Sequence, residues 1–242
     1  MITFRVSAVC YVRDGYTGLP LQPSALLCKL DGLPCHPVRK KEGYLVFTNL
    51  APGPHRLSLR CAGYQEEWVD FTLGETAVDL EVAMKPGRGY AFRTAVTRLT
   101  VTVSGGDGPA EGRVLWVAAP SVPEIKLAQT KAEAGEQSFR IFCKGSVRPR
   151  TGTYLINDKE KSEIIRLVEM DGETGRLERP LTYDHSRGKL LMPAQSYHTD
   201  EKGVFQAVFT QPCAVELFSG EKGLLADITL AEGENTAEAA LT

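Results

Sequence analysis

The sequence predicts an all-β protein with two β-sandwich-like domains in tandem. Three observations lead to this prediction. Several segments alternate apolar and polar side chains with a period of two, as strands with one buried face do. Turn-forming pairs such as Asp14-Gly15 and Pro52-Gly53 recur along the chain, which is typical of sandwiches and barrels. A break rich in proline and glycine at 85–89 separates two strand-rich parts, so we place the domains at 1–85 and 90–242.

The alternating segments are the expected strands of the two domains. Their apolar positions are expected to face a core, because successive side chains of a strand point to opposite faces. In the first domain these positions are Phe4, Val6, Ala8 and Cys10, then Leu57, Leu59 and Cys61, then Val78, Leu80, Val82 and Met84. In the second domain they are Leu99, Val101 and Val103, then Leu224, Ala226, Ile228 and Leu230.

One segment, 123–134, is open to two interpretations. Pro123 suits the first position of a helix and Gly135 its end. The alternation of Ile125 and Leu127 instead favours two strands joined by a turn at 133–136, and we prefer this interpretation.

Charge and hydropathy exclude two classes of partner. The chain of 242 residues has 28 Lys and Arg against 30 Asp and Glu, a net charge of −2, and nine of each sign fall in residues 1–85. Because nucleic acids are bound through clustered cations, we expect no nucleic-acid partner. The longest apolar stretch, 114–119, is far shorter than the roughly 20 residues that span a bilayer. The first residues lack a secretory signal, so we expect the cytoplasm, or a particle assembled there.

The six cysteines contain no Cys-x-x-Cys pair, so we expect no zinc site, and no cofactor motif is present either. Four of them, Cys10, Cys28, Cys35 and Cys61, lie in the first domain. A disulfide such as Cys10 with Cys61 stays open, but free thiols packed as small apolar residues are the preferred interpretation.

The first 85 residues carry a recognisable order of strands and turns. It runs through Asp14-Gly15 and Gly18-Leu19-Pro20, then through 42–53 with its Asn-Leu-Ala-Pro-Gly element, and ends at Ala62-Gly63-Tyr64. This pattern resembles the carboxypeptidase regulatory-like, or transthyretin-like, β-sandwich family. The resemblance covers about a third of the chain and implies an accessory module without catalytic residues.

Two later segments suggest further relationships. The order of turn, strand, proline and strand in 199–218 is similar to that in 40–59, which implies a second β-domain and leaves open whether it is a diverged repeat. The segment 163–188 is similar in style to linking segments of phage-tail-like and contractile injection assemblies.

Candidate site residues are few, and each has a structural interpretation. Asp184, His185, His198 and Asp200 could meet as metal ligands or acid–base groups if a hairpin forms around 189–194, although polar loops are the preferred interpretation. An aromatic surface for a sugar or a peptide could form beside them, although core packing is preferred. Its residues would be Trp68, Trp116, Tyr183 and Tyr197.

We therefore expect a non-catalytic structural or adaptor protein, a subunit of a larger assembly such as a phage-tail-like or contractile injection particle. Its partners would be other protein subunits or copies of itself, joined through sheet edges. Two alternatives remain: a carbohydrate- or peptide-binding sandwich, and a hydrolase that uses the Asp184, His185, His198 and Asp200 cluster.

Overall fold

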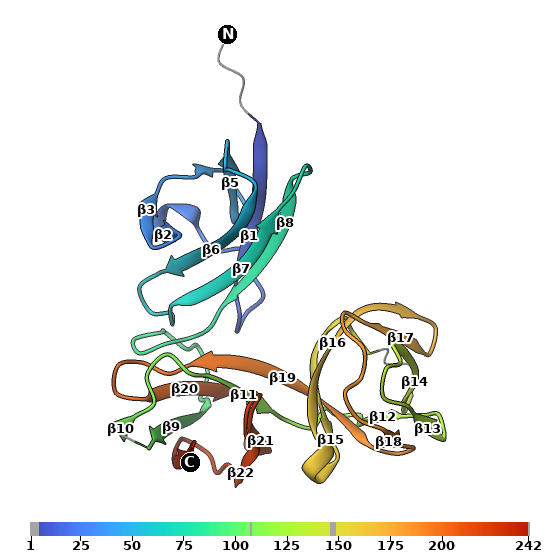
Figure 1. Ribbon diagram of the computed structural model, residues 1–242. Helices are drawn as coiled ribbons and strands as arrows, with labels where there is room; N and C mark the ends of the chain where they lie inside the picture. Colours follow the sequence, from blue (N-terminus) through green and yellow to red (C-terminus); the bar gives the residue numbers. More distant parts are fainter. Residues whose placement is uncertain (1–4, 107, 146–148, 242) are drawn as a thin grey trace. The chain divides into compact units, whose positions relative to one another are not determined.

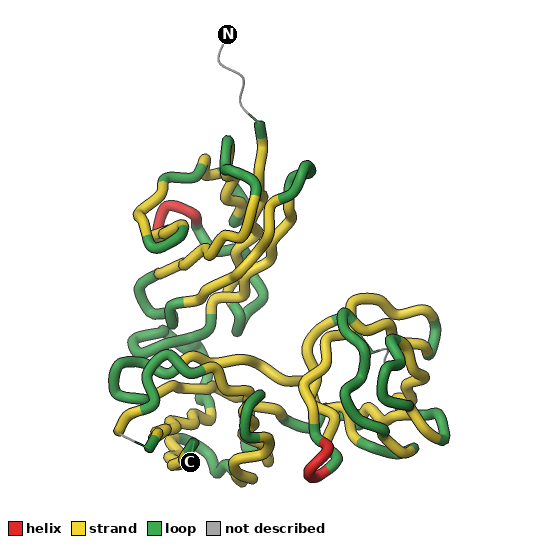
Figure 2. The backbone as a smooth tube through the Cα atoms, in the orientation of Figure 1, coloured by secondary structure: helices red, strands yellow, loops and turns green. Residues whose placement is uncertain are grey.

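A computed structural model of the chain describes residues 5–106, 108–145 and 149–241. Within these residues the structure is built of strands and two single-turn 3-10 helices, with no α-helix, so the all-β prediction is confirmed (Figure 2). No helix in the described part has the length and hydropathy to span a membrane. The chain divides into two compact units, Met1–Arg93 (unit 1) and Thr94–Thr242 (unit 2).

Unit 1 is a sandwich of two four-stranded sheets, ordered β4-β5-β1-β8 and β3-β2-β6-β7 (Figure 1). Its elements are β1 (Val6–Asp14), η1 (Pro23–Ala25), β2 (Leu27–Leu30), β3 (Leu33–Cys35), β4 (Val38–Arg39), β5 (Tyr44–Thr48), β6 (Gly53–Arg60), β7 (Glu67–Leu73) and β8 (Val78–Met84). The predicted alternation places Ala8 and Cys10 of β1 together with Leu57 and Leu59 of β6 in one fully buried core. Phe4, predicted for the same strand as Ala8, lies outside the described residues.

Unit 1 extends to Arg93, past the break predicted at 85–89, because the segment after β8 folds back onto it. The amide of Gly87 donates to the carbonyl of Gly63 at 2.9 Å. The hydroxyl of Tyr90 donates to the carboxylate of Asp14 at the end of β1. The ring of Phe92 packs edge-on against Tyr16, with 5.2 Å between ring centroids.

Unit 2 contains fifteen strands and one 3-10 helix among its described residues. They are β9 (Thr97–Gly105), β10 (Gly108–Pro109), β11 (Val114–Ala118), β12 (Ile125–Leu127), β13 (Lys131–Ala132), β14 (Ser138–Cys143), β15 (Gly152–Asn157), η2 (Lys159–Lys161), β16 (Glu163–Asp171), β17 (Thr174–Leu177), β18 (His185–Ser186), β19 (Leu190–His198), β20 (Val204–Phe209), β21 (Ala214–Ser219), β22 (Gly223–Thr229) and β23 (Glu234–Ala240). The segment 123–134 is extended as preferred, with β12 paired to β14.

Two large cores and one small core lie within unit 2, and the small core, which includes Leu155, Met192 and Phe218, lies where the two large ones meet. The first fills a sandwich between the sheet of β9, β20 and β23 and the strands β11, β21 and β22. The second is formed by residues between 125 and 191, which make a separate β-lobe. The long strand β19 belongs to both, because its residues 190–193 pair with β15 and its residues 194–198 pair with β11.

The sandwich of unit 2 repeats the strand topology of unit 1. In one sheet the first strand lies between an antiparallel and a parallel neighbour, β5-β1-β8 in unit 1 and β20-β9-β23 in unit 2. The other sheet has the order β2-β6-β7 in unit 1 and β11-β21-β22 in unit 2. In unit 1 the paired strands β2 and β3 are connected by the two-residue turn Asp31-Gly32. The equivalent paired strands of unit 2, β11 and β19, are connected by the β-lobe.

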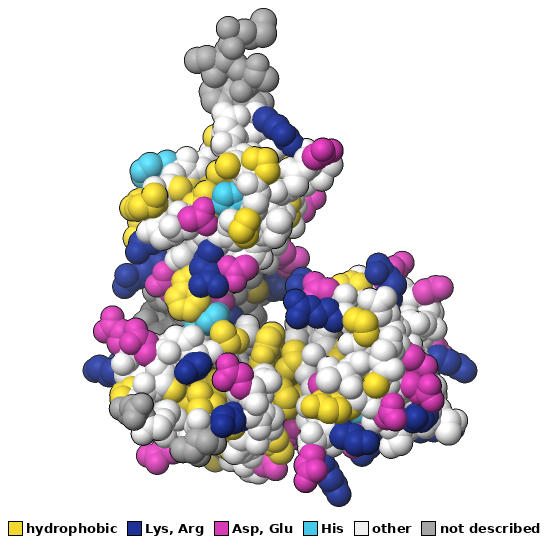
Figure 3. All heavy atoms as spheres, viewed as in Figure 1, with side chains coloured by type: hydrophobic (Ala, Val, Ile, Leu, Met, Phe, Trp, Pro, Cys, Tyr) yellow, Lys and Arg dark blue, Asp and Glu magenta, His cyan; other side chains and the backbone are white. Residues whose placement is uncertain are grey.

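Charged side chains of both signs are interspersed on the surface of each unit. On the face drawn in Figure 3, Lys and Arg side chains lie among Asp and Glu side chains in both units, with apolar side chains between them. This mixture agrees with the near-equal numbers of basic and acidic residues in the sequence, 28 and 30.

Leu224, predicted to face the core, is 39% exposed, and Leu225 packs against the core instead. The reason is a register shift in the pairing of β21 with β22 between Leu217 and Phe218, since a bulge exchanges the faces of the residues beyond it. All six cysteines are free thiols, so the Cys10–Cys61 disulfide does not form in this structure.

Candidate functional site

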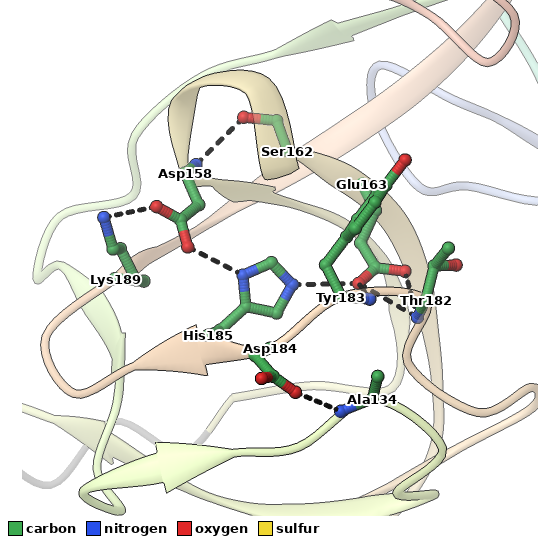
Figure 4. A network of polar contacts seen from close by, with 9 residues as sticks. All are labelled: Ala134, Asp158, Ser162, Glu163, Thr182, Tyr183, Asp184, His185 and Lys189. Carbon is green, nitrogen blue, oxygen red and sulfur yellow. Dashed lines mark hydrogen bonds and ion pairs between the residues drawn. The ribbon is translucent and has the colours of Figure 1, made fainter.

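The most elaborate polar network of the β-lobe is centred on His185 (Figure 4). This residue begins the two-residue strand β18, which pairs with β13, and its side chain is fully buried. Its ring nitrogen Nδ1 lies 3.0 Å from Oδ2 of Asp158, and Nε2 lies 2.8 Å from Oε1 of Glu163. Asp158 and Glu163 flank η2, so the ring connects both ends of the η2 turn to β18.

The two contacts determine the charge of the ring. Ionised carboxylate oxygens only accept hydrogen bonds, so both ring nitrogens donate, which requires an imidazolium. Burial alone would lower the pKa of His185, but the hydrogen bonds to Glu163 and then Asp158 outweigh it and raise the pKa above its usual value. At a pH below this raised pKa, His185 is therefore a buried cation.

Each carboxylate is itself stabilised in the charged form. Burial would raise the pKa of both, but hydrogen bonds leave both below their usual values. Asp158 accepts from Lys189 and His185. Glu163 accepts from His185 and from the backbone amides of Thr182 and Tyr183, at 2.9 and 3.1 Å. With two cations and two anions the network is neutral.

An open pocket of about 790 Å³ lies beside this network, and Lys131, Lys159, Lys161 and Asp184 are among its lining residues. A general base needs a nitrogen or carboxylate that is free to take a proton. Both nitrogens of His185 are already engaged, and Lys131 is paired with Asp184 at 2.9 Å. The arrangement therefore holds the loops of the lobe together, and its histidine is not available as a base.

The structure does not bring together the four residues predicted as a cluster. The hairpin expected around 189–194 does not form, because Leu190–His198 is a single strand, about 26 Å long at roughly 3.3 Å per residue. His198 lies near the far end of β19, opposite Val114 of the sandwich. Asp200 accepts the amides of Lys202 and Val204 in the turn before β20. In the described residues no group of three His, Cys, Asp or Glu could hold a metal ion.

The predicted aromatic residues lie in different surroundings. Tyr197 lies in the sandwich core, stacked on Phe205 with 5.1 Å between ring centroids, so it offers no surface contact. Trp116 is half-buried against the small core where lobe and sandwich meet. Tyr183 is 42% exposed. Trp68 belongs to unit 1, where it is half-buried opposite Ser58, on the same strand face as Asp70.

A second histidine network, in unit 1, was missed by the sequence analysis. His55 Nδ1 lies 2.8 Å from Oδ2 of Asp31, and Nε2 lies 2.8 Å from the carbonyl oxygen of Ala51. These hydrogen bonds, first to Ala51 and then to Asp31, raise the pKa of His55. An open pocket of about 570 Å³ borders it, together with Arg56 and Asp70, which form an ion pair at 2.6 Å. Both nitrogens of His55 are again engaged.

Comparisons with known proteins assign no family. No protein-family model matches the chain, and no curated protein matches it in sequence. Among solved structures, the major pilin subunit BcpA of Bacillus cereus aligns with 97% of this chain and 98% of its own, at 9% identity and a TM-score of 0.28.

Two further solved structures align over nearly all of this chain. The TIE protein of Bacillus anthracis aligns with 98% of it at 12% identity and a TM-score of 0.26, and the chain spans 50% of that protein. The minor pilin GBS52 of Streptococcus agalactiae aligns with 96% of this chain and 94% of its own, at 12% identity and a TM-score of 0.22. These TM-scores are too low to assign a fold or a function.

Proposed function

We propose that the chain is a non-catalytic structural subunit that joins other protein subunits through the edges of its sandwiches. The observation that carries this proposal is the open edge of β23. This seven-residue strand pairs with β9 on one side, and no other strand of the described residues pairs with its other side.

The backbone groups on that edge can be identified from the register. The amide of Arg98 donates to the carbonyl of Gly233, and the amide of Leu241 donates to the carbonyl of Ser104. In a parallel ladder every second residue of a strand bonds to a given neighbour, so between these two bonds residues that bond to β9 alternate with residues that face away from it. The N–H and C=O groups of Asn235, Ala237 and Ala239 therefore face β9. Those of Thr236 and Glu238 point to the open edge, where they can bind a further strand.

Natural proteins protect edge strands with charged side chains, above all lysine, and with proline or bulges. The sequence of β23, Glu-Asn-Thr-Ala-Glu-Ala-Ala, contains no lysine or proline, and its pairing with β9 has no register shift. Its exposed side chains, those of Glu234, Thr236, Glu238 and Ala240, are small or acidic. An edge without lysine, proline or a bulge, whose charges are two glutamates, supports strand addition by a partner.

Substitution of one edge residue tests the proposal. Thr236→Pro removes an outward donor without removing a bond to β9, whereas Thr236→Val keeps the donor and serves as the matched control. In extracts of cells that naturally produce the chain, we expect the wild type and Thr236→Val in a large complex on native size separation. Thr236→Pro should shift to smaller species. Migration of all three as the isolated chain would contradict the proposal.

As a finer proposal, the assembly is a phage-tail-like or contractile injection particle built in the cytoplasm. This proposal is supported only by the similarity of 163–188 to linking segments of such particles. The membership of residues 1–85 in the carboxypeptidase regulatory-like family likewise stays a prediction.

A further inference from the structure

On the outer face of the β4-β5-β1-β8 sheet in unit 1, the strands β4, β5 and β1 carry apolar side chains where a solvent-facing sheet is usually polar. Two cross-strand rows form it: Val38, Val46 and Val9 in one, and Tyr44 and Tyr11 in the other. Val38 is 49% and Tyr44 is 40% exposed, and the other three are half-buried. The two tyrosine rings lie 5.1 Å apart. We call these five residues the valine-tyrosine face.

The fold itself does not require an apolar residue at each position of this face, because unit 2 has polar residues at three of the equivalent positions, although Val204 stands where unit 1 has Tyr44. The register places Thr100 and Gln206 of β9 and β20 where β1 and β5 have Val9 and Val46. Gln206 there donates to the hydroxyl of Thr100 at 3.1 Å. Thr102 stands where unit 1 has Tyr11. An apolar patch that the fold does not need is typical of an interaction surface.

Charges of opposite sign flank the valine-tyrosine face. On the β4 side, Lys40 follows the strand, and its amide donates to the carbonyl of Tyr44 at 2.9 Å. On the β8 side lie Asp79, opposite Val9, and Glu81, opposite Tyr11. Glu81 is paired with Arg13 at 2.6 Å. Lys40 and Asp79 have no ion pair within the described residues.

This charge distribution is self-complementary. When two such sheets face each other about a two-fold axis parallel to their strands, β4 of one copy lies over β8 of the other. Lys40 of each copy, which the register places level with Glu81, then faces the acidic border formed by Glu81 and the neighbouring Asp79 of its partner. The apolar rows cover each other, as in the packing of two sheets in a sandwich. We propose that the valine-tyrosine face is the interface of a homodimer. This inference rests on the proposed function, since it names a second copy as one of the partners.

Substitution with the residues of unit 2 tests the apolar part. The double variant Val9→Thr/Val46→Gln carries side chains that the equivalent strands already tolerate. Leu27→Thr is the matched control, because Leu27 is 69% exposed on the outer face of the other sheet. In sedimentation equilibrium we expect a wild-type dimer, a dissociation constant at least about tenfold higher for the double variant, and no change for Leu27→Thr.

A charge exchange tests the orientation. In homodimers of Lys40→Glu the introduced carboxylate meets the acidic border of the partner copy, and in homodimers of Asp79→Lys two lysines meet. Each variant alone should therefore dimerise weakly. An equimolar mixture restores both opposite-charge contacts and should form heterodimers. Lys29→Glu, on the outer face of the other sheet, is the charge control.

The following results would overturn the inference: a wild type that is monomeric at every concentration, a double variant that dimerises as tightly as the wild type, or a mixture no tighter than its components. None of them would affect the expected complex in cell extracts or its loss in Thr236→Pro. Failure of the homodimer and failure of the proposed function are therefore distinguishable.

Discussion

Gly43 and Gly203 occupy equivalent positions in the two units. The amide of Val12 donates to the carbonyl of Gly43 at 2.9 Å, and the amide of Val103 donates to that of Gly203 at 2.8 Å. Both glycines have positive φ, +85° and +71°. A Cβ at either position would lie less than 3.0 Å from a carbonyl oxygen, that of Val12 at Gly43 and that of Val103 at Gly203. The same close backbone approach thus begins β5 and β20.

Replacement of either glycine by alanine should destabilise its own unit. Strain at positive φ and the clash with a carbonyl should together lower the free energy of unfolding by about 2 kcal/mol or more. The control is Gly18→Ala, with φ +74° and nothing within 4 Å of a Cβ, which should cost about 1 kcal/mol. Urea unfolding of single-tryptophan variants can follow each unit separately, through Trp68 in unit 1 and Trp116 in unit 2. Equal losses for Gly18→Ala and Gly43→Ala would contradict the expected clash.

Removal of the buried cation should destabilise unit 2. His185→Leu leaves Asp158 and Glu163 without their shared donor, and loss of one partner from a buried ion pair typically costs about 3–5 kcal/mol. Because His36 is exposed, His36→Leu should change the unfolding of unit 1 by less than about 0.5 kcal/mol. Trp116 fluorescence in urea measures the first effect and Trp68 fluorescence the second.

The stability that His185 provides should depend on pH in a defined direction. Its pKa is raised above 6.5 in the folded state, so its contribution is complete below pH 6.5 and is lost as the pH rises through the folded value. The pKa values of Glu163 and Asp158 are lowered below 4.5 and 3.8, so their contribution is lost as the pH falls through the folded values. The excess stability of the wild type over His185→Leu should therefore be greatest between about pH 4.5 and 6.5. A difference that grows from about pH 6.5 to 9 would contradict the imidazolium assignment.

The packing of the segment after β8 against unit 1 should depend on Asp14. Its carboxylate accepts the amides of Tyr16 and Thr17 at 2.7 and 3.0 Å and the hydroxyls of Tyr64 and Tyr90. Asp14→Ala removes all four bonds, so trypsin should cleave after Arg88 and Arg93 several-fold faster than in the wild type. Tyr90→Phe removes one of the four bonds to Asp14 and should give an intermediate rate. An unchanged rate for Asp14→Ala would show that other contacts hold the segment.

Core thiols should be unreactive in the folded protein. Burial, followed by the neighbouring Cys28, raises the pKa of Cys10 to about 12, and burial raises that of Cys28 to about 11. Because the thiolate is the reactive form, a thiol reagent at about pH 8 should leave both unmodified, as peptide mass analysis can show. In urea all six cysteines should react. Modification of Cys10 in the folded protein at the rate seen in urea would contradict its burial.

The fold class and the inner faces of the strands could be predicted from the sequence because a period of two determines which side chains share a face. Leu99, Val101 and Val103 are all fully buried, as their alternation indicated. The segments 40–59 and 199–218, which share an order of turn, strand, proline and strand, contain the equivalent strands β5 and β20, but this equivalence became visible only from the strand pairings.

The β-lobe and the His185 network could not be predicted, because alternation gives the face of a strand and not its partner. Asp158 and Glu163 lie 27 and 22 residues before His185. They meet it only because β15 pairs with β19 and β13 with β18. No local motif in the sequence carries that information.

The central claim is that this chain is an assembly subunit whose partners include its own copies. Its most direct test is the absolute mass of the purified wild-type protein, measured by light scattering across a wide concentration range. The account predicts twice the mass of one chain, with dissociation only on dilution. The mass of a single chain at every concentration would contradict it.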